Sequence, residues 1–151
     1  MKPVTRLFPL IVAALLPLSA LADLPGKHPA YLHALSDLRA ARWLVEHRPG
    51  DARVSGDEDV AIERIDETIN EIKHAAIDDG KDIHDHPAVD EKLDRRGRLH
   101  RAEELLNKTH ADLAREEDNP DVRGLRDRAI RHLDLAIHAT HDAIRAVEHH
   151  Q

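Results

Sequence analysis

The chain has no cysteine and very few aromatic or sulfur-containing residues. Its 151 residues include one each of Met, Trp, Tyr and Phe. Without cysteine there are no disulfides and no attachment motif for a c-type haem. Copper(I) also lacks its soft sulfur ligands, because the single methionine is the initiator. These absences leave imidazole and carboxylate groups as the ligands from which a metal site would be built.

Residues suited to catalysis are also scarce. Beyond the first 22 residues, serine occurs only at Ser36 and Ser55, and there is no cysteine nucleophile. A di-iron site in a helical bundle needs two Glu-x-x-His motifs and two further glutamates. Only the motif from Glu71 to His74 fits that pattern. We therefore expect a protein that is not an enzyme.

Basic residues are outnumbered by acidic ones. The chain has 22 Lys and Arg against 29 Asp and Glu, a net charge of −7 with neutral histidines. DNA, RNA and anionic lipid need a basic surface on the protein that binds them. The charge therefore argues against nucleic acid as a partner and suits the capture of cations.

The first 22 residues have the pattern of a secretory signal peptide. Lys2 and Arg6 precede an apolar run from Leu7 to Leu18, and Ala20-Leu21-Ala22 fits the signal peptidase pattern. The run is too short to span a bilayer, which takes about 20 residues. We predict a signal peptide over 1–22 and a single helical-bundle domain over 23–151. The mature chain would be periplasmic or secreted, with no stable membrane insertion after cleavage.

Apolar residues recur at helical spacing through the rest of the chain, and no alternating strand pattern is present. The spacing predicts four helices. Their expected ranges are Pro29 to about His47, Ser55 to about Gly80, Pro87 to Glu117, and Pro120 to near the C-terminus. Ser55 and Glu58 have the spacing of a capping box. Four amphipathic helices with short connections favour an all-α, antiparallel up-down-up-down four-helix bundle.

All 13 histidines lie beyond the predicted signal peptide. In an up-down-up-down bundle, the start of helix one, the connection between helices two and three, and the end of helix four share one end of the molecule. The histidines that this order would gather there are His28, His74, His84, His86, His141, His149 and His150.

The densest group of histidines and acids lies between Lys73 and Pro87. His74 and Asp78 are four residues apart and so share a helix face, and His84 and His86 flank Asp85. Imidazole and carboxylate suit Zn(II), Cu(II) and Ni(II). The candidate metal ligands in this segment are His74, Asp78, Asp82, His84 and His86. The alternative interpretation is a polar turn whose acids cap the backbone.

A second candidate group lies in helix four. Asp134, His138 and His141 follow one another at spacings of four and three, which places them on one helix face. Together with His132 they form the second set of candidate metal ligands. The alternative is that these are ordinary polar positions flanking a bundle seam.

Two segments carry a resemblance to a known family. The small metal-binding proteins of the bacterial periplasm resemble this chain in two segments, 72–84 and 132–138. The first contains the motif Ile-Lys-His-Ala followed by Gly-Lys. The resemblance covers roughly residues 65–150. It implies a short four-helix bundle that binds several divalent ions, copper among them, for storage, buffering or detoxification. The positions that it implicates are His74, His84, His132, Asp134 and His138.

The sequence thus predicts an exported protein that binds Cu(II), Ni(II) or Zn(II). One rival is a non-enzymatic structural or protein-interaction module of the envelope, stress-related, with a binding surface around Tyr31, Trp43 and the Arg39/Arg42 pair. Another is a pH-responsive protein in which clustered imidazolium ions repel one another and loosen one end of the bundle in acid. Convergence of His74, His84, His86 and His141 would favour metal binding, and their dispersal would favour the interaction module.

Overall fold

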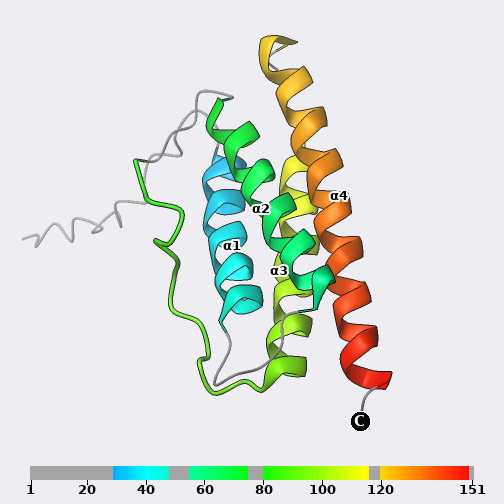
Figure 1. The fold of residues 1–151 in the computed structure, drawn as a ribbon. Coiled ribbons are helices and arrows are strands. Elements are labelled where there is room, and N and C mark those ends of the chain that lie inside the picture. Colours follow the sequence, from blue (N-terminus) through cyan, green and yellow to red (C-terminus); the bar gives the residue numbers. More distant parts are fainter. Residues whose placement is uncertain (1–28, 48–54, 75–79, 116–119, 150–151) are drawn as a thin grey trace, which may run out of the picture.

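The structure, a computed structural model, describes residues 29–47, 55–74, 80–115 and 120–149. They form four helices, and the described residues contain no strand (Figure 1). The helices are α1 (Pro29–Glu46), α2 (Gly56–His74), α3 (Arg95–Ala114) and α4 (Pro120–His149). The predicted all-α four-helix bundle is confirmed. The predicted signal peptide lies outside the described residues, and none of the described helices is long and apolar enough to cross a membrane.

Side-chain caps explain where α2 and α3 begin. The backbone N–H of Ser55 donates to the Glu58 carboxylate at 3.0 Å, and the Glu58 N–H donates to Ser55 Oγ at 3.3 Å. This is the predicted capping box. At the start of α3, Asp94 accepts the Gly97 N–H at 2.7 Å. A Cβ at position 97 would lie 3.0 Å from Asp94 Oδ1, so glycine leaves room for the capping carboxylate.

The third helix begins later than predicted. Pro87 was expected to open it, but α3 starts at Arg95. A proline disfavours helical geometry at the residue before it, and Asp90 then holds a turn by accepting the Lys92 N–H at 3.0 Å. Asp94 supplies the actual cap. Residues 80–94 are therefore not helical, and we call them the crossover segment.

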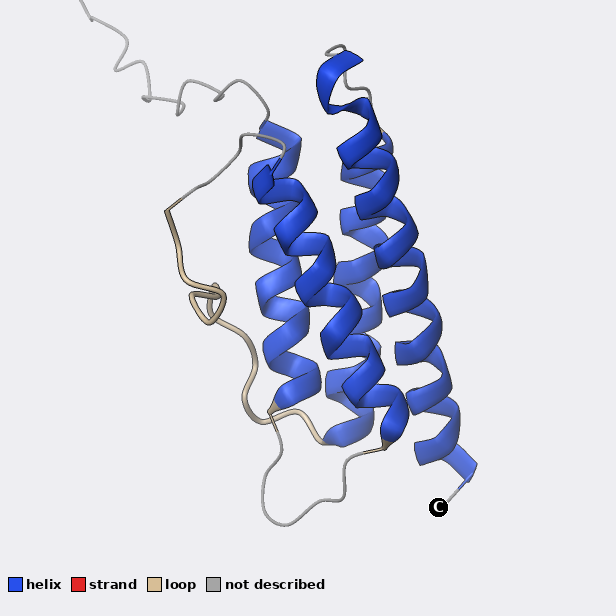
Figure 2. Cartoon of the chain, turned by 45° about the horizontal axis from the view of Figure 1, so that its top comes forward, coloured by secondary structure: helices blue, strands red, loops and turns tan. Residues whose placement is uncertain are grey.

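The order of helix directions also differs from the predicted one. Arg95, in the first turn of α3, forms two hydrogen bonds of 2.9 Å with Glu58, in the first turn of α2. Both helices therefore start at the same end of the bundle and run in the same direction. The crossover segment carries the chain back along the outside of α1 (Figures 1 and 2). The bundle is thus not up-down-up-down but one with a single long crossover connection.

Chain length permits this crossover. The connection 75–94 has 20 residues, which at up to about 3.3 Å per residue is more than enough to pass a helix about 30 Å long. Around the bundle, α1 packs against α2 and α3, and α4 packs against the same two helices. Every one of these neighbouring pairs is antiparallel (Figure 1).

The core lies between the four helices. The largest fully buried apolar side chains are Leu35, Leu38, Leu44, Val45, Ile65, Ile69, Leu99, Leu106, Leu113 and Leu133.

Buried arginines attach the crossover segment to this core. Arg98, which is 2% exposed, donates to the carbonyl oxygens of Leu44 at 3.3 Å and Leu93 at 3.2 Å. Arg39 lies within 3.5 Å of the Lys81 carbonyl oxygen. These groups connect the crossover segment to α1 and α3.

Candidate metal-binding residues

The candidate ligands of the crossover segment mainly organise its own turn. Asp82 Oδ1 accepts the His84 N–H at 2.9 Å, and the Asp82 N–H donates to Asp85 Oδ2 at 3.0 Å. Asp82 and His84 are both exposed. The carboxylates thus cap backbone groups, as the polar-turn alternative predicts. Asp78, another predicted ligand, lies outside the described residues.

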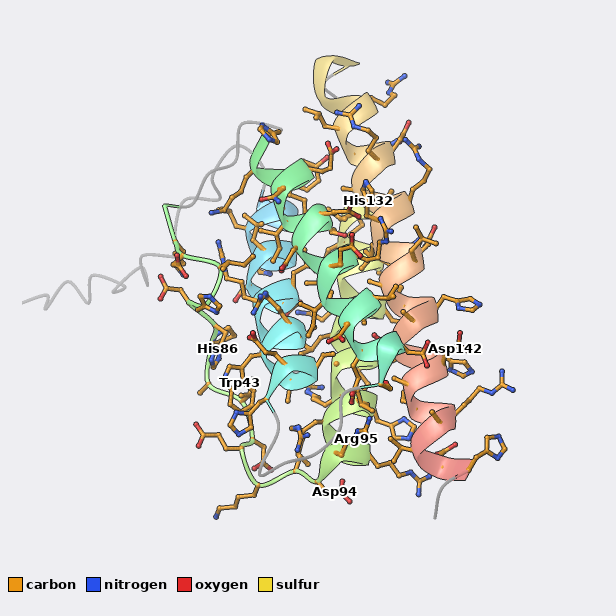
Figure 3. All side chains as sticks on the ribbon, in the orientation of Figure 1. Trp43, His86, Asp94, Arg95, His132 and Asp142 are labelled. Atoms are coloured by element: carbon orange, nitrogen blue, oxygen red, sulfur yellow. The ribbon has the colours of Figure 1, made fainter. Side chains whose placement is uncertain are left out.

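His86 packs on the first helix. Its Nδ1 lies 2.8 Å from the Pro87 carbonyl oxygen, which can only accept, so Nδ1 carries a proton. Its ring centroid is 5.1 Å from that of Trp43 (Figure 3), and Trp43 stacks on His47 at 4.2 Å. The crossover histidine therefore helps to hold its segment against α1.

The described histidines among those predicted to gather at one end of the bundle do not do so, and His28 and His150 lie outside the described residues. His74 ends α2 at the end of the bundle where α4 begins, as the 3.0 Å ion pair between Glu71 and Arg128 shows. His141 lies toward the other end of α4, opposite Glu103. The prediction was wrong because α3 runs in the same direction as α2, which places the end of α4 at the opposite end of the bundle from the end of α2. Within the described ranges, no group of three or more His, Cys, Asp or Glu side chains is placed to hold a metal ion.

The four candidate ligands of α4 each lie within 3.3 Å of a group of the complementary type. We call these the α4 pairs, with nitrogen to oxygen distances in parentheses: His132–Glu67 (2.8 Å), Asp134–His110 (3.3 Å), His138–Asp142 (3.0 Å) and His141–Glu103 (3.1 Å). Three of them join α4 to a neighbouring helix, and the fourth lies within α4. Asp134, His138 and His141 therefore do not form one three-ligand site, although they were predicted on one face.

A regular register produces the pairs between helices. On the α3 side, positions seven apart on α4 face positions seven apart on α3, as expected for an antiparallel pair with heptad spacing. The facing residues are Asp134 with His110, His141 with Glu103, and Glu148 with Arg96. In every case a carboxylate faces an imidazole or a guanidinium. The partners Glu67, Glu103, His110 and Asp142 were missed by the sequence analysis, although their heptad and i,i+4 spacings carry the signal.

The His132 pair differs from the others in its burial. The His132 side chain (Figure 3) is 27% exposed, whereas the histidines of the other three pairs are 40–78% exposed. His132 Nδ1 is close enough to Glu67 for an ion pair but is not aligned for a hydrogen bond. Within the described part of the chain, one Glu71 carboxylate oxygen is likewise buried without a hydrogen-bond partner.

The surface proposed for an interaction module is largely absent. Tyr31, Arg39 and Arg42 are 3%, 1% and 9% exposed. Burial lowers the pKa of Arg42, but its hydrogen bond to Asp66 and the carboxylates of Asp66 and Glu46 outweigh burial, so the pKa is raised overall. Arg42 is thus a charged residue that joins α1 to α2, with its Nε 2.7 Å from Asp66.

The comparisons with known proteins found no relatives: no family model, no curated protein and no solved structure matches the chain.

Proposed function

We propose that this chain is an exported, non-catalytic protein that binds divalent transition-metal ions at the α4 pairs, and thereby stores, buffers or detoxifies them. One observation carries the proposal. In each α4 pair an imidazole nitrogen and a carboxylate oxygen already lie 2.8–3.3 Å apart. These are the ligand types that suit Cu(II), Ni(II) and Zn(II), and the net charge of −7 favours cations near the surface.

The geometry of the pairs sets the expected affinity. Each pair offers two protein ligands, so water would complete the coordination of a bound ion. A closed structural site has four protein ligands. We therefore expect several weak sites and not one tight site, which suits buffering better than a permanent structural metal.

The pair of His132 and Glu67 is the strongest of these sites. It is more buried than the exposed pair of His138, whose side chain is 78% exposed. The carboxylate of Glu71 lies one turn from Glu67 on the same face of α2. Glu71 is not placed as a third ligand, but its negative charge favours a cation nearby.

Calorimetry and thermal unfolding with Zn(II), Ni(II) and Cu(II) at pH 7.5 test the proposal. An ion that binds the native state raises the melting temperature by mass action. The double variant His132→Gln/His141→Gln should lose most of this rise. His33→Gln, at an exposed position of α1, is the matched control and should keep it. Lower pH should weaken binding, because each imidazole must lose its proton to bind. No heat and no melting shift at millimolar ion would refute the proposal.

The same pairs also support a second candidate, a structural module of the envelope. Three of the four pairs join α4 to α2 or α3, so they would hold the bundle together without metal. Metal-free protein that loses stability in the double variant His132→Gln/His141→Gln, in the absence of any metal effect on the unaltered chain, would favour this candidate.

A further inference from the structure

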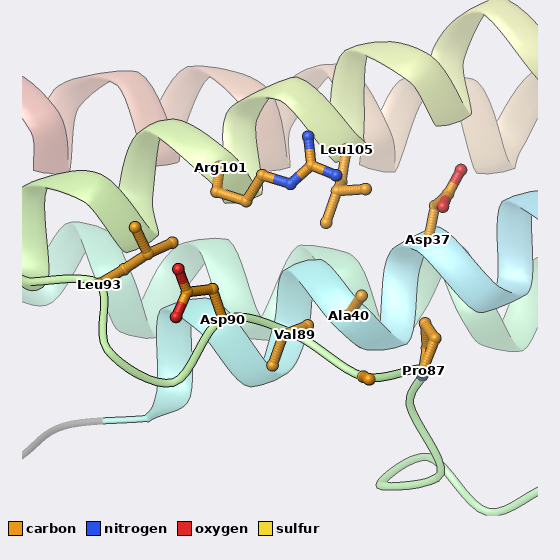
Figure 4. Close-up of a pocket in the computed structure, with 9 residues that line it drawn as sticks. Asp37, Ala40, Pro87, Val89, Asp90, Leu93, Arg101 and Leu105 are labelled. Atoms are coloured by element: carbon orange, nitrogen blue, oxygen red, sulfur yellow. The ribbon is translucent and has the colours of Figure 1, made fainter.

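A cavity of about 440 Å³ lies between the crossover segment and helices α1 and α3 (Figure 4). The cavity is separate from the α4 pairs, because none of its lining residues belongs to α4. Its volume falls within the range of small-molecule sites, about 300–1,000 Å³. Six of its nine lining residues are of apolar type: Ala40, Pro87, Ala88, Val89, Leu93 and Leu105.

Three charged residues accompany this apolar lining. Asp37 comes from α1, Asp90 from the crossover segment and Arg101 from α3. In Figure 4 the two carboxylates lie toward opposite ends of the cavity, with Ala40 and Val89 between them. The guanidinium of Arg101 lies on the α3 side, next to Leu105. A few charged groups around an apolar floor are typical of sites that orient a small ligand.

Each charged group keeps some bonding capacity. Asp37 Oδ2 accepts from Lys108 at 2.6 Å, and Asp90 Oδ1 accepts the Lys92 N–H. Arg101 Nη1 pairs with Glu104 at 2.7 Å. Among the described residues these are the contacts of the three groups, so one oxygen of each carboxylate and two guanidinium nitrogens remain for a ligand.

We propose that this cavity binds a small zwitterion with an aliphatic body, of the size of an amino acid or a dipeptide. The ligand carboxylate would accept from Arg101, its ammonium would donate to Asp90 or Asp37, and its aliphatic part would cover Val89 and Leu105. A cation alone would leave the two remaining guanidinium nitrogens of Arg101 unused, and an anion alone would meet two carboxylates. A zwitterion complements the arginine with its carboxylate and one of the two aspartates with its ammonium, and Asp37 already has an ion pair with Lys108.

The experiment uses the full chain and three matched probes. The dipeptide leucyl-leucine carries both charges, its C-terminal amide lacks the carboxylate, and its N-acetyl derivative lacks the ammonium. Binding is measured by calorimetry and by chemical shifts of backbone amides. Each lost charge-assisted hydrogen bond should weaken binding about tenfold or more, so the dipeptide should bind best and both derivatives clearly worse.

Two variants locate the site. Arg101→Gln should reduce the affinity for the dipeptide about tenfold and leave the affinity for its amide unchanged. Asp90→Asn keeps an oxygen for the Lys92 N–H, so the turn is retained, and it should weaken the dipeptide and the amide alike. Arg131→Gln, an exposed arginine of α4, is the control and should change nothing.

Three results would overturn the proposal: no binding of the dipeptide at millimolar concentration, equal binding of all three probes, or an affinity that Arg101→Gln leaves unchanged. Because the variants lie outside the α4 pairs, metal binding is not at stake in any of these outcomes.

Discussion

The crossover segment and the flanks of α4 both combine histidines with acidic residues, but they use them differently. In the crossover segment, Asp82 and Asp85 cap backbone groups and His86 packs on Trp43. On α4, His132 and His141 each face a carboxylate of another helix. The segment with the higher density of histidines and acids in the sequence is thus not the one in which the structure pairs imidazole with carboxylate. Register between two helices, and not local density, brings imidazole and carboxylate together.

Backbone geometry explains the contrast. A helix repeats its direction every 3.6 residues, so positions seven apart on α4 return to the same neighbour. In a loop, short acidic side chains find the backbone N–H groups of their own turn first.

The largest effect is expected where the crossover segment meets the core. Arg98→Met removes the donors to the carbonyl oxygens of Leu44 and Leu93. Leaving two largely buried acceptors unpaired should cost about 2–4 kcal/mol of unfolding free energy. Denaturant unfolding measures it. The exposed control Arg131→Met should stay within about 0.5 kcal/mol, and an equal loss in both variants would show that Arg98 does not anchor the segment.

A smaller loss is expected between α1 and α2. Arg42→Met removes the contacts with Asp66 and Glu46 and should cost about 2 kcal/mol. Because the pKa of Arg42 is raised, its contribution is complete below the ordinary arginine value and is lost only as the pH rises through the folded-state value. The loss should therefore be the same at pH 6 and pH 9. A clear difference between these two pH values would contradict a permanently charged Arg42.

Sequence reasoning predicted the helices better than their directions. Pro29, the capping box of Ser55 with Glu58, and Pro120 marked three helix starts correctly. Pro87 gave a wrong start for α3, because a proline suits an extended segment as well as a first helical turn. The residue that caps α3 is Asp94, seven positions later. The direction of α3 depends on packing between distant segments, which local patterns do not encode.

For the same reason, the sequence predicted the candidate ligands on α4 but not the residues that face them. All four α4 candidates lie in pairs, but three of their four partners come from α2 or α3. Helical spacing along α4 shows which residues share a face. It does not show which residue of another helix lies opposite.

The contact between the crossover segment and Trp43 should give a modest effect. His86→Ala removes the ring that lies 5.1 Å from the indole and should cost about 0.5–1 kcal/mol. Trp43 is the only tryptophan, so its emission reports the change directly and should move to longer wavelength. His84→Ala, at an exposed position of the same segment, should leave the emission as it is. An emission change with His84→Ala alone would contradict this packing.

The smallest effects are expected in the α4 pairs without metal. A double-mutant cycle of Glu103→Gln and His141→Gln should give a coupling of about 0.2–1 kcal/mol, the range of exposed pairs. The same cycle for His138 and Asp142, whose histidine is 78% exposed, should give less. A coupling of several kcal/mol at either pair would show that the pairs serve chiefly to stabilise the bundle.

The central claim is that metal ions bind where the helices place the ligands, along α4. Titration of ¹⁵N-labelled protein with Zn(II), followed by the ring signals of the histidines, tests it most directly. We expect the signals of His132 and His141 to shift first and those of His84 and His33 to follow late or not at all. Early shifts confined to His74, His84 and His86, or no shift of any histidine at millimolar zinc, would contradict it.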